Sequence, residues 1–441
     1  MTLGPWSIQS SPQDYSGQTR NLNLHYVSTQ GPTQGAHLVR DGLVSVANLG
    51  GIVRAAVELD GDIIAAAAGR LWRLRSSGVL TDEGAVQDSN NLVMAAGFSK
   101  VAITSGGKYY VYDGAVSIRA TGQITNPVGV AYMDGYYIVI GDDGARHDLI
   151  AVSGQDDPYT FAALDFASAE GDPDPLVAII RDHSELKLFG TKTTETFYNS
   201  GGTFPFSRNT SAFIERGCHN AQTVAKSDNA VYWIGDDKKA YRTFGGGPEI
   251  ISTDPLSELF AKSTILGGFA FEDRGAKFYA VRIAGGTTWA YKIPTGLWCE
   301  FSTGADHAPW IATCMASAGS VQYFGTSTGK ICTHSGFEDD GSVIRAELWG
   351  MPMTEMVNDL RYVELQVDTG KGDLGREGTI SLDVSPDGKL WTTDDTRSLG
   401  SMGNYRIVPK WHNLGTYLNF VQLRVWTTDP IARDIYGGRL G

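Results

Sequence analysis

Hydrophobic and polar positions alternate over short stretches of this chain, and residues suited to tight turns interrupt the alternation at regular intervals. The stretch 222–244, QTVAKSDNAVYWIGDDKKAYRTF, shows the pattern. Two turn clusters, Ser227-Asp228-Asn229 and Gly235-Asp236-Asp237, separate three short runs of alternating small, apolar and aromatic residues. Alternation indicates half-buried strands, and Asp, Asn and Gly suit tight turns. We predict a three-stranded meander, which needs neighbours because it cannot bury its own apolar face.

The same order of strand, turn, strand, turn and strand recurs along the chain. The other copies occupy residues 53–74, 100–118, 128–152, 177–198, 269–293 and 311–334. The first turns of all seven copies fall near residues 60, 106, 134, 183, 228, 274 and 318. Most intervals are close to the roughly 40–50 residues of one four-stranded propeller blade. The interval from Gly106 to Asp134 is too short, so that blade is either compressed or miscounted.

This recurrence predicts an all-β protein built on a β-propeller of six to seven blades, with seven preferred. A β-sandwich rich in hairpins is the alternative, and the even spacing of the repeats argues against it. The propeller is predicted to span residues 43–340. Its longest interruptions are two loops at residues 155–175 and 199–217, and long ordered loops on a rigid scaffold are places where partner contacts gather.

The regions before and after the repeats, residues 1–42 and 341–441, have a different pattern of polar and hydrophobic residues. Residues 1–42 are polar and rich in turn residues, which predicts an extended arm that wraps the body or pairs with a distant strand; a disordered tail is the alternative for the first dozen residues. Residues 341–441 carry longer strands, such as 360–368, and are predicted to form a β-sandwich domain. One short helix is predicted at Asp254-Pro255-LSELFAK, with the carboxylate as its cap.

Charge and composition narrow the class of protein. The 441 residues carry a formal net charge of −13, and an acidic surface argues against a protein that grips nucleic acid. It does not exclude a smooth acidic channel through which DNA slides. The four cysteines, at positions 218, 299, 314 and 332, are expected to be reduced. With no secretory signal and no long apolar run, the chain is expected to be made in a cytoplasm and to stay soluble, without a membrane span.

Several motifs invite a chemical interpretation. The segment Ser385 to Trp391, SPDGKLW, is comparable with the Asp-box of sialidases, but its spacing departs from S-x-D-x-G-x-x-W and it occurs once, so a hairpin turn is the better interpretation. Three acidic clusters, at 142–143, 236–237 and 339–340, lack the order of a calcium loop and are also predicted to be turns.

Titratable residues give no convincing site. Glu185 and Glu195 lie on predicted strands where a glycosidase could place its acid and base, but two carboxylates among 49 acidic residues carry no signal. The eight histidines are scattered singly, and Cys218-His219 has no further ligands nearby. No phosphate-binding loop, dinucleotide fingerprint or nucleophile elbow is present. We therefore predict no catalytic, cofactor-binding or metal-binding residue, no cofactor, and a protein that is not an enzyme.

Three segments together carry a family resemblance. Residues 176–201 (LVAIIRDHSELKLFGTKTTETFYNSG), residues 214–235 (IERGCHNAQTVAKSDNAVYWIG) and a short helix after ISTDP resemble the packaged-DNA stabilisation proteins of short-tailed bacteriophages. This family is also called the tail hub, tail accessory or nozzle proteins. Residues 381–391 and 420–441 resemble its C-terminal strands. The likeness covers most of the chain from about residue 12 and is one of pattern, since it includes no catalytic signature.

The resemblance implies a structural virion protein located in the tail and assembled in the host bacterial cytoplasm. Such a protein forms a homo-hexameric ring below the portal and its adaptor proteins, as part of the head-tail connector, and extends and helps close the DNA channel until DNA ejection. Tail fibres or spikes and a needle or plug protein attach to this ring, and packaged DNA passes through its lumen without specific binding.

Two other classes stay open from the sequence. A carbohydrate-active β-propeller enzyme or lectin acting on host glycans is the main alternative, and a cellular repeat scaffold is a third. An enzyme of this kind gathers two carboxylates about 5–10 Å apart in a pocket with aromatic platforms. A hub should instead show apolar lateral surfaces and self-association.

Overall fold

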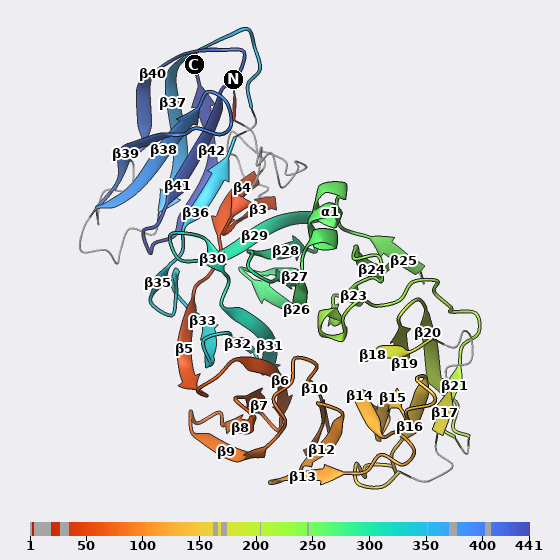
Figure 1. The fold of residues 1–441 in the computed structure, drawn as a ribbon. Helices are drawn as coiled ribbons and strands as arrows, with labels where there is room; N and C mark the ends of the chain where they lie inside the picture. Colours follow the sequence, from red (N-terminus) through yellow and green to blue (C-terminus); the bar gives the residue numbers. More distant parts are fainter. Residues whose placement is uncertain are drawn as a thin grey trace.

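The computed structural model describes residues 2–3, 19–26, 35–161, 166–168, 174–202, 204–244, 247–350, 352–369, 377–401 and 407–441. Figure 1 shows two parts: a ring of small sheets and, beside it, a smaller part that holds both ends of the chain. The structure is almost entirely β, as predicted. Among the described residues, no helix has the length and apolar character needed to cross a membrane.

The ring is a β-propeller of seven antiparallel blades with four strands each, which confirms the preferred blade number. The first strands of neighbouring blades contact one another around the axis. The strands of the first three blades are β6 (Val53–Leu59), β7 (Asp62–Ala67), β8 (Arg70–Leu74) and β9 (Leu80–Ala85); β10 (Val93–Gly97), β11 (Lys100–Ser105), β12 (Lys108–Tyr112) and β13 (Val116–Arg119); and β14 (Asn126–Met133), β15 (Tyr136–Asp142), β16 (Leu149–Val152) and β17 (Phe166–Ser168).

The remaining blades follow in chain order except for one strand. They consist of β18 (Leu176–Asp182), β19 (Glu185–Gly190), β20 (Thr194–Asn199) and β21 (Phe206–Arg208); β22 (Ala225–Ser227), β23 (Ala230–Ile234), β24 (Ala240–Phe244) and β25 (Gly247–Ile250); β26 (Ile265–Asp273), β27 (Ala276–Ile283), β28 (Thr288–Lys292) and β29 (Leu297–Thr303); and β31 (Ala312–Ala318), β32 (Val321–Thr326), β33 (Lys330–His334) and β5 (Leu43–Asn48). Strand β5 precedes every other blade strand in sequence and pairs with β33, so the two ends of the repeat array close the ring together.

The short interval in the sequence pattern was a miscount. The first hairpin of the second blade turns at Phe98-Ser99, whereas Gly106 lies in the turn between β11 and β12. Strand β10 escaped the pattern because its sequence, VMAAG, has no polar alternation, and its turn contains no Gly, Asn or Asp. Ser99 nevertheless takes the left-handed φ of 58°, a conformation that Asp60 and Asp134 adopt in the equivalent turns.

The smaller part is a β-sandwich. One sheet contains β1 (Thr2–Leu3), β3 (Leu22–Tyr26), β4 (Gly35–Val39), β37 (Val357–Thr369), β40 (Lys410–Leu418) and β42 (Arg433–Leu440), and the other contains β36 (Ala346–Trp349), β38 (Gly378–Ser385), β39 (Thr392–Gly400) and β41 (Gln422–Thr427). The two sheets share one buried apolar core. In β37 the predicted alternation holds, since Val363 and Leu365 are buried while Tyr362 is exposed.

The N-terminal residues join the two parts. Strand β2 (Thr19–Arg20) pairs in parallel with β29 of the sixth blade and antiparallel with β36 of the sandwich, so one hydrogen-bonded sheet runs through both. Strand β4 pairs with β42. The arm therefore pairs with distant strands, as one of the predicted alternatives stated. The division of the chain at residues 42 and 340 stays a prediction.

The predicted helix is present as α1 (Asp254–Lys262). Asp254 is the first helical residue and Thr253 is the N-cap, so the expected capping carboxylate lies one position too late. Leu256 and Phe260 are buried in a core shared with blade strands β23, β27 and β29. Shorter elements complete the fold: the 3₁₀ helix η1 (Ala221–Thr223) and strands β30 (Ala308–Pro309), β34 (Glu338–Asp339) and β35 (Ser342–Val343).

Gly42 marks the place where the arm enters the ring. A Cβ added to it would lie 2.2 Å from the backbone oxygen of Glu338, which belongs to β34 beside β5. We expect Gly42→Ala to lower the free energy of unfolding by about 1–3 kcal/mol because backbone must shift to admit the methyl group. Gly247→Ala is the control, since a Cβ there meets nothing within 4 Å. Equal stability of the two variants in urea unfolding would contradict the expected clash.

Candidate functional site at the propeller axis and the junction

The propeller has a cavity among the connections that lead into its inner strands. It measures about 440 Å³ and is lined by residues of the second to fifth blades and their connections, among them Gly106, Asn126, Leu176 and His219. None of the described residues that line it is Asp or Glu. Burial lowers the pKa of His219, so its imidazole tends to be neutral. A glycosidase needs two carboxylates around the scissile bond, and this cavity supplies none.

The structure does not bring Glu185 and Glu195 together as an acid and a base. Glu185 pairs across β19 and β20 with Tyr198, and Glu195 pairs with Leu188, so the two carboxylates lie on opposite faces of the blade. Glu185 forms an ion pair with Lys187 at 2.9 Å, and Glu195 forms one with Arg208 at 3.3 Å. Each carboxylate is thus held by a cation on its own face.

The turn interpretations are confirmed for the sialidase-like segment and for the acidic clusters at 142–143 and 236–237. Asp387 accepts hydrogen bonds from the backbone N–H groups of Lys389 and Leu390 in the turn after β38. Asp143 accepts hydrogen bonds from the backbone N–H groups of Ala145 and Arg146. The cluster at 339–340 differs, because one of its carboxylates lies in the junction between propeller and sandwich.

That carboxylate, Asp339, forms a buried ion pair with Arg40. The Arg40 Nη1–Asp339 Oδ1 distance is 2.9 Å, the Nη2–Oδ2 distance is 2.5 Å, and the side chains are 1% and 0% exposed. Arg40 also donates through Nε to Asn21 Oδ1 at 2.8 Å and through Nη2 to the carbonyl oxygen of Ser302 at 2.8 Å. Thr303 donates its hydroxyl to Asp339. The guanidinium of Arg40 therefore connects the N-terminal arm to the sixth blade and to strand β34.

A second group of charges surrounds Glu347 on β36. Arg20 lies 2.5 Å from Glu300 and 3.8 Å from Glu347, while His307 Nε2 and Arg345 Nε lie 3.1 Å and 2.6 Å from Glu347 Oε1. Burial raises the pKa of Glu347, but the close approach of His307 and the charges of His307, Arg345 and Arg20 outweigh it and lower the pKa to about 2. Glu347 is therefore ionised at neutral pH. The basic side chains around it come from both parts of the molecule.

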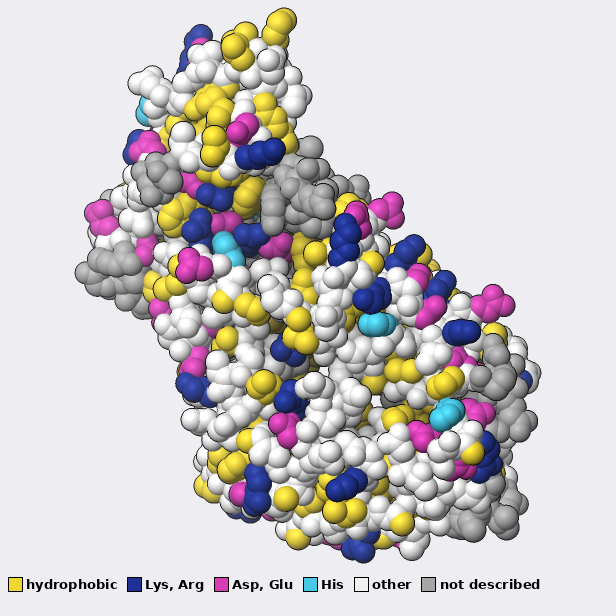
Figure 2. Space-filling model, in the orientation of Figure 1, with side chains coloured by type: hydrophobic (Ala, Val, Ile, Leu, Met, Phe, Trp, Pro, Cys, Tyr) yellow, Lys and Arg dark blue, Asp and Glu magenta, His cyan; other side chains and the backbone are white. Residues whose placement is uncertain are grey.

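A third ionic contact crosses the junction at the end of the sixth blade. Arg274 forms a bidentate pair with Asp434 of β42, with distances of 2.7 Å and 2.9 Å. In Figure 2 Lys and Arg, Asp and Glu, and a histidine are interleaved at the neck between the two parts. The junction is thus held by ion pairs as well as by the continuous sheet.

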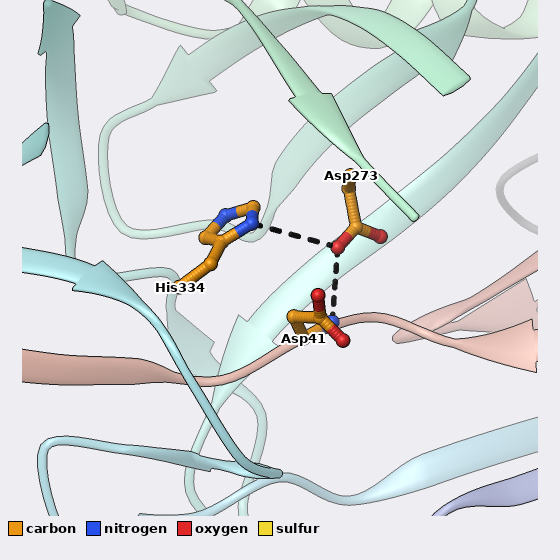
Figure 3. A group of neighbouring side chains, drawn as sticks. All are labelled: Asp41, Asp273 and His334. Atoms are coloured by element: carbon orange, nitrogen blue, oxygen red, sulfur yellow. Dashed lines mark hydrogen bonds and ion pairs between the residues drawn. The ribbon is translucent and has the colours of Figure 1, made fainter. Parts of the chain in front are cut away.

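Next to these pairs, three metal-ligating side chains meet (Figure 3). Asp41, Asp273 and His334 place one ligand atom each within 4.8 Å of the others. Asp41 lies between β4 and β5, Asp273 ends β26, and His334 ends β33. The backbone N–H of Asp41 donates to Asp273 Oδ1 at 3.0 Å, and His334 Nδ1 lies 3.9 Å from the same oxygen. No sequence pattern indicates this group, because its members lie far apart in the chain.

Burial shifts the proton affinities in this group. Burial, followed by the charge of Asp41, raises the pKa of Asp273 to about 7, against the opposing effect of the Asp41 N–H, Arg40 and Arg274. Burial and then the charge of Arg40 lower the pKa of His334 to about 4, which keeps its imidazole neutral. Lys292 also lies in the field of Asp273, and its pKa is lowered to about 8, chiefly by burial.

His37 on β4 gives the junction a pH dependence. Its ring is buried, neither nitrogen has a hydrogen-bond partner among the described residues, and burial followed by the charge of Lys292 lowers its pKa to about 4. Because the unfolded chain binds this proton near pH 6.5, stability is full above pH 6.5 and falls as the pH drops toward 4. We expect wild type to lose about 2 kcal/mol more than His37→Leu between pH 7 and pH 4.5 in urea titrations.

The control for this prediction is His183→Ala, since that ring is exposed and bonded to Asp182. It should keep the wild-type dependence on pH. Parallel pH profiles of wild type and His37→Leu would show that His37 is not the responsible group.

One protein-family model matches most of this chain. The model of the Phage_stabilise family, described as "Bacteriophage P22 Gp10, beta-propeller", matches residues 8–331. No curated protein matches the sequence.

Solved structures match this chain at low sequence identity. A streptogramin B lyase is 10% identical, with 67% of this chain and 98% of that chain covered and a TM-score of 0.48. BamB from Moraxella catarrhalis is 11% identical, with 71% and 93% covered and a TM-score of 0.42. The computationally designed Ika8 protein is 15% identical, with 67% and 99% covered and a TM-score of 0.42. These similarities carry no argument about function.

Proposed function

The chain belongs to the Phage_stabilise family of bacteriophage structural proteins, and from this membership we propose that it forms a ring in the phage tail that extends and helps close the DNA channel. In this proposal six copies assemble below the portal and adaptor proteins, in the host cytoplasm, and the ring anchors tail fibres or spikes and a needle or plug protein. The family match over residues 8–331 is the observation that carries the proposal.

The junction between the propeller and the sandwich supports a role in which the subunit transmits mechanical force. Rigid parts joined by a single flexible linker would move independently, whereas here β2 continues the sheet of the sixth blade into the sandwich. The pairs Arg40–Asp339 and Arg274–Asp434 add ionic contacts across the same boundary. A subunit that transmits force without hinging suits a wall that holds pressurised DNA.

The charge of the chain suits a channel. A formal net charge of −13 repels phosphates, so DNA passing a ring of such subunits meets no strong binding site. Closed rings of identical subunits use heterologous contacts, in which two different faces of each copy meet.

We place one of these faces at the long loops. The predicted loop at 199–217 contains β21, the outer strand of the fourth blade (Figure 1), and two aromatic side chains there are exposed, Tyr198 in β20 (43%) and Phe213 after β21 (41%). The predicted loop at 155–175 likewise contains β17, the outer strand of the third blade, and its residues 162–165 and 169–173 fall outside the described part of the chain. Exposed aromatic side chains on an ordered loop are typical anchors of protein contacts.

Assembly tests this proposal directly. Wild-type protein mixed with the portal and adaptor proteins is expected to form hexameric rings, visible by negative-stain electron microscopy and mass photometry. Phe213→Asp should reduce the fraction of rings at least tenfold because it places a charge in an apolar contact. Ile118→Asp, at a residue 62% exposed on β13, is the matched control and should assemble normally.

Two results would oppose different parts of the proposal. A wild-type chain that stays a single copy with every tail component would oppose the ring. Normal rings with Phe213→Asp would oppose only the assignment of the loop.

The carbohydrate-active alternative gains no support from the site. The axial cavity has no carboxylate among its described lining residues, and Glu185 and Glu195 face away from each other. A structural role without enzymatic activity agrees with the family.

A further inference from the structure

We propose that Asp41, Asp273 and His334 form a binding site for a divalent transition-metal ion, with Zn²⁺ as the best fit, where the arm enters the propeller. The site goes beyond the channel-wall role and does not depend on it, since a ring can form with or without a bound ion.

The three ligands come from three separate parts of the fold. Asp41 belongs to the connection between arm and ring, Asp273 to the sixth blade and His334 to the seventh. In Figure 3 the imidazole of His334 and the carboxylate of Asp273 point toward each other, with Asp41 next to the same carboxylate. Ligand atoms around tetrahedral zinc lie roughly 3.4 Å apart, so a cluster with atoms within 4.8 Å closes with small side-chain rotations.

The buried carboxylate of Asp273 has an oxygen without a hydrogen-bond partner among the described residues. Asp273 is 1% exposed, and its Oδ2 has no hydrogen-bond partner among the described residues. The Asp273–His334 separation of 3.9 Å is too long for a hydrogen bond. Buried carboxylate oxygens normally have hydrogen-bond partners, because a buried acceptor without a partner is destabilising.

The cations near the cluster do not balance the negative charge of its two carboxylates. Arg40 and Arg274 are the arginines whose charges reach Asp273, but Arg40 is paired with Asp339 and Arg274 with Asp434. Asp41 and Asp273 therefore place two carboxylates side by side beyond those two pairs, in a field to which Lys292 also contributes. A divalent ion balances both carboxylates, and a proton on Asp273 is the competing solution.

The ligand chemistry selects the class of ion. An imidazole together with two carboxylates suits Zn²⁺, whereas Ca²⁺ and Mg²⁺ favour shells made only of oxygen. Asp41 and His334 are each partly exposed, so a water molecule can complete a tetrahedral shell. The ring of His334 stacks on Phe324, with centroids 4.5 Å apart, which fixes its orientation toward the cluster.

Metal titration of the full-length protein tests the site. The protein is stripped with a chelator and titrated with ZnCl₂ by isothermal calorimetry, with CaCl₂ as the comparison ion. We expect one equivalent of Zn²⁺ to bind, at least tenfold weaker binding for Asp273→Asn and His334→Ala, and a rise in Tm on binding that these two variants lack. His183→Ala is the matched control, because it removes an exposed histidine that lies beside an aspartate outside the cluster.

The outcomes separate the metal from its alternatives. X-ray absorption showing one imidazole and oxygen ligands around zinc would support the site. Absence of stoichiometric Zn²⁺ binding by wild type, or equal binding by His334→Ala, would overturn it. If Asp273→Asn fails to fold, Asp41→Asn at the partly exposed ligand gives the same discrimination, and unchanged binding by that variant also counts against the site.

Discussion

Replacing Arg40 by methionine is expected to lower the free energy of unfolding by about 3–5 kcal/mol, a large share of the stability of a typical domain. The substitution leaves Asp339 as a buried carboxylate without its cation, and it removes the bonds from Arg40 to Asn21 and Ser302. The desolvation cost of an unpaired charge dominates the effect. Urea unfolding monitored by tryptophan fluorescence measures it.

Two further variants separate charge from packing. Arg54→Met removes an ion pair with Asp88 whose side chains are 24% and 43% exposed, and it should cost less than about 1 kcal/mol. Arg40→Met combined with Asp339→Asn should recover part of the loss because no buried charge is left unpaired. If Arg40→Met is no more destabilising than Arg54→Met, the buried pair does not hold the junction.

Truncating Trp233 to alanine is expected to cost about 3–5 kcal/mol. The ring is fully buried between the fourth and fifth blades, with its centroid 5.3 Å from that of Phe189 and 5.5 Å from that of Tyr241. Its Nε1 donates a hydrogen bond to the carbonyl oxygen of Gly217 at 3.1 Å. Alanine therefore creates a cavity and leaves that carbonyl without this donor.

The matched control lies in the same blade. Phe244 is 68% exposed, so Phe244→Ala should change stability by less than about 0.5 kcal/mol. Similar losses in the two variants would mean that contact between neighbouring blades contributes little to stability.

Local patterns predicted the propeller well because hairpins are local structures. Alternation and turn residues located β22, β23 and β24 within the stretch 222–244, and the helix α1 followed from Asp254-Pro255. The pattern failed at β10, where neither alternation nor turn chemistry marks the strand. Seven blades were nevertheless the preferred count, because each remaining interval is close to one blade.

The junction could not be predicted because its contacts join distant residues. Arg40 and Asp339 are separated by 299 positions, and Asp41 and Asp273 by 232. Asp339 had the sequence signature of a turn, and nothing local distinguishes it from Asp143, which does serve in a turn. His334 was one of eight scattered histidines, and its carboxylate neighbours became visible only once the sixth and seventh blades were placed side by side.

Electron microscopy of the intact virion tests the central claim, that this chain is a wall segment of the DNA channel. We expect a ring of copies below the portal and adaptor, with each propeller and sandwich fitted as one rigid unit against its neighbours. A particle whose tail lacks this chain, or a chain that works as an isolated copy cleaving host glycans, would contradict it.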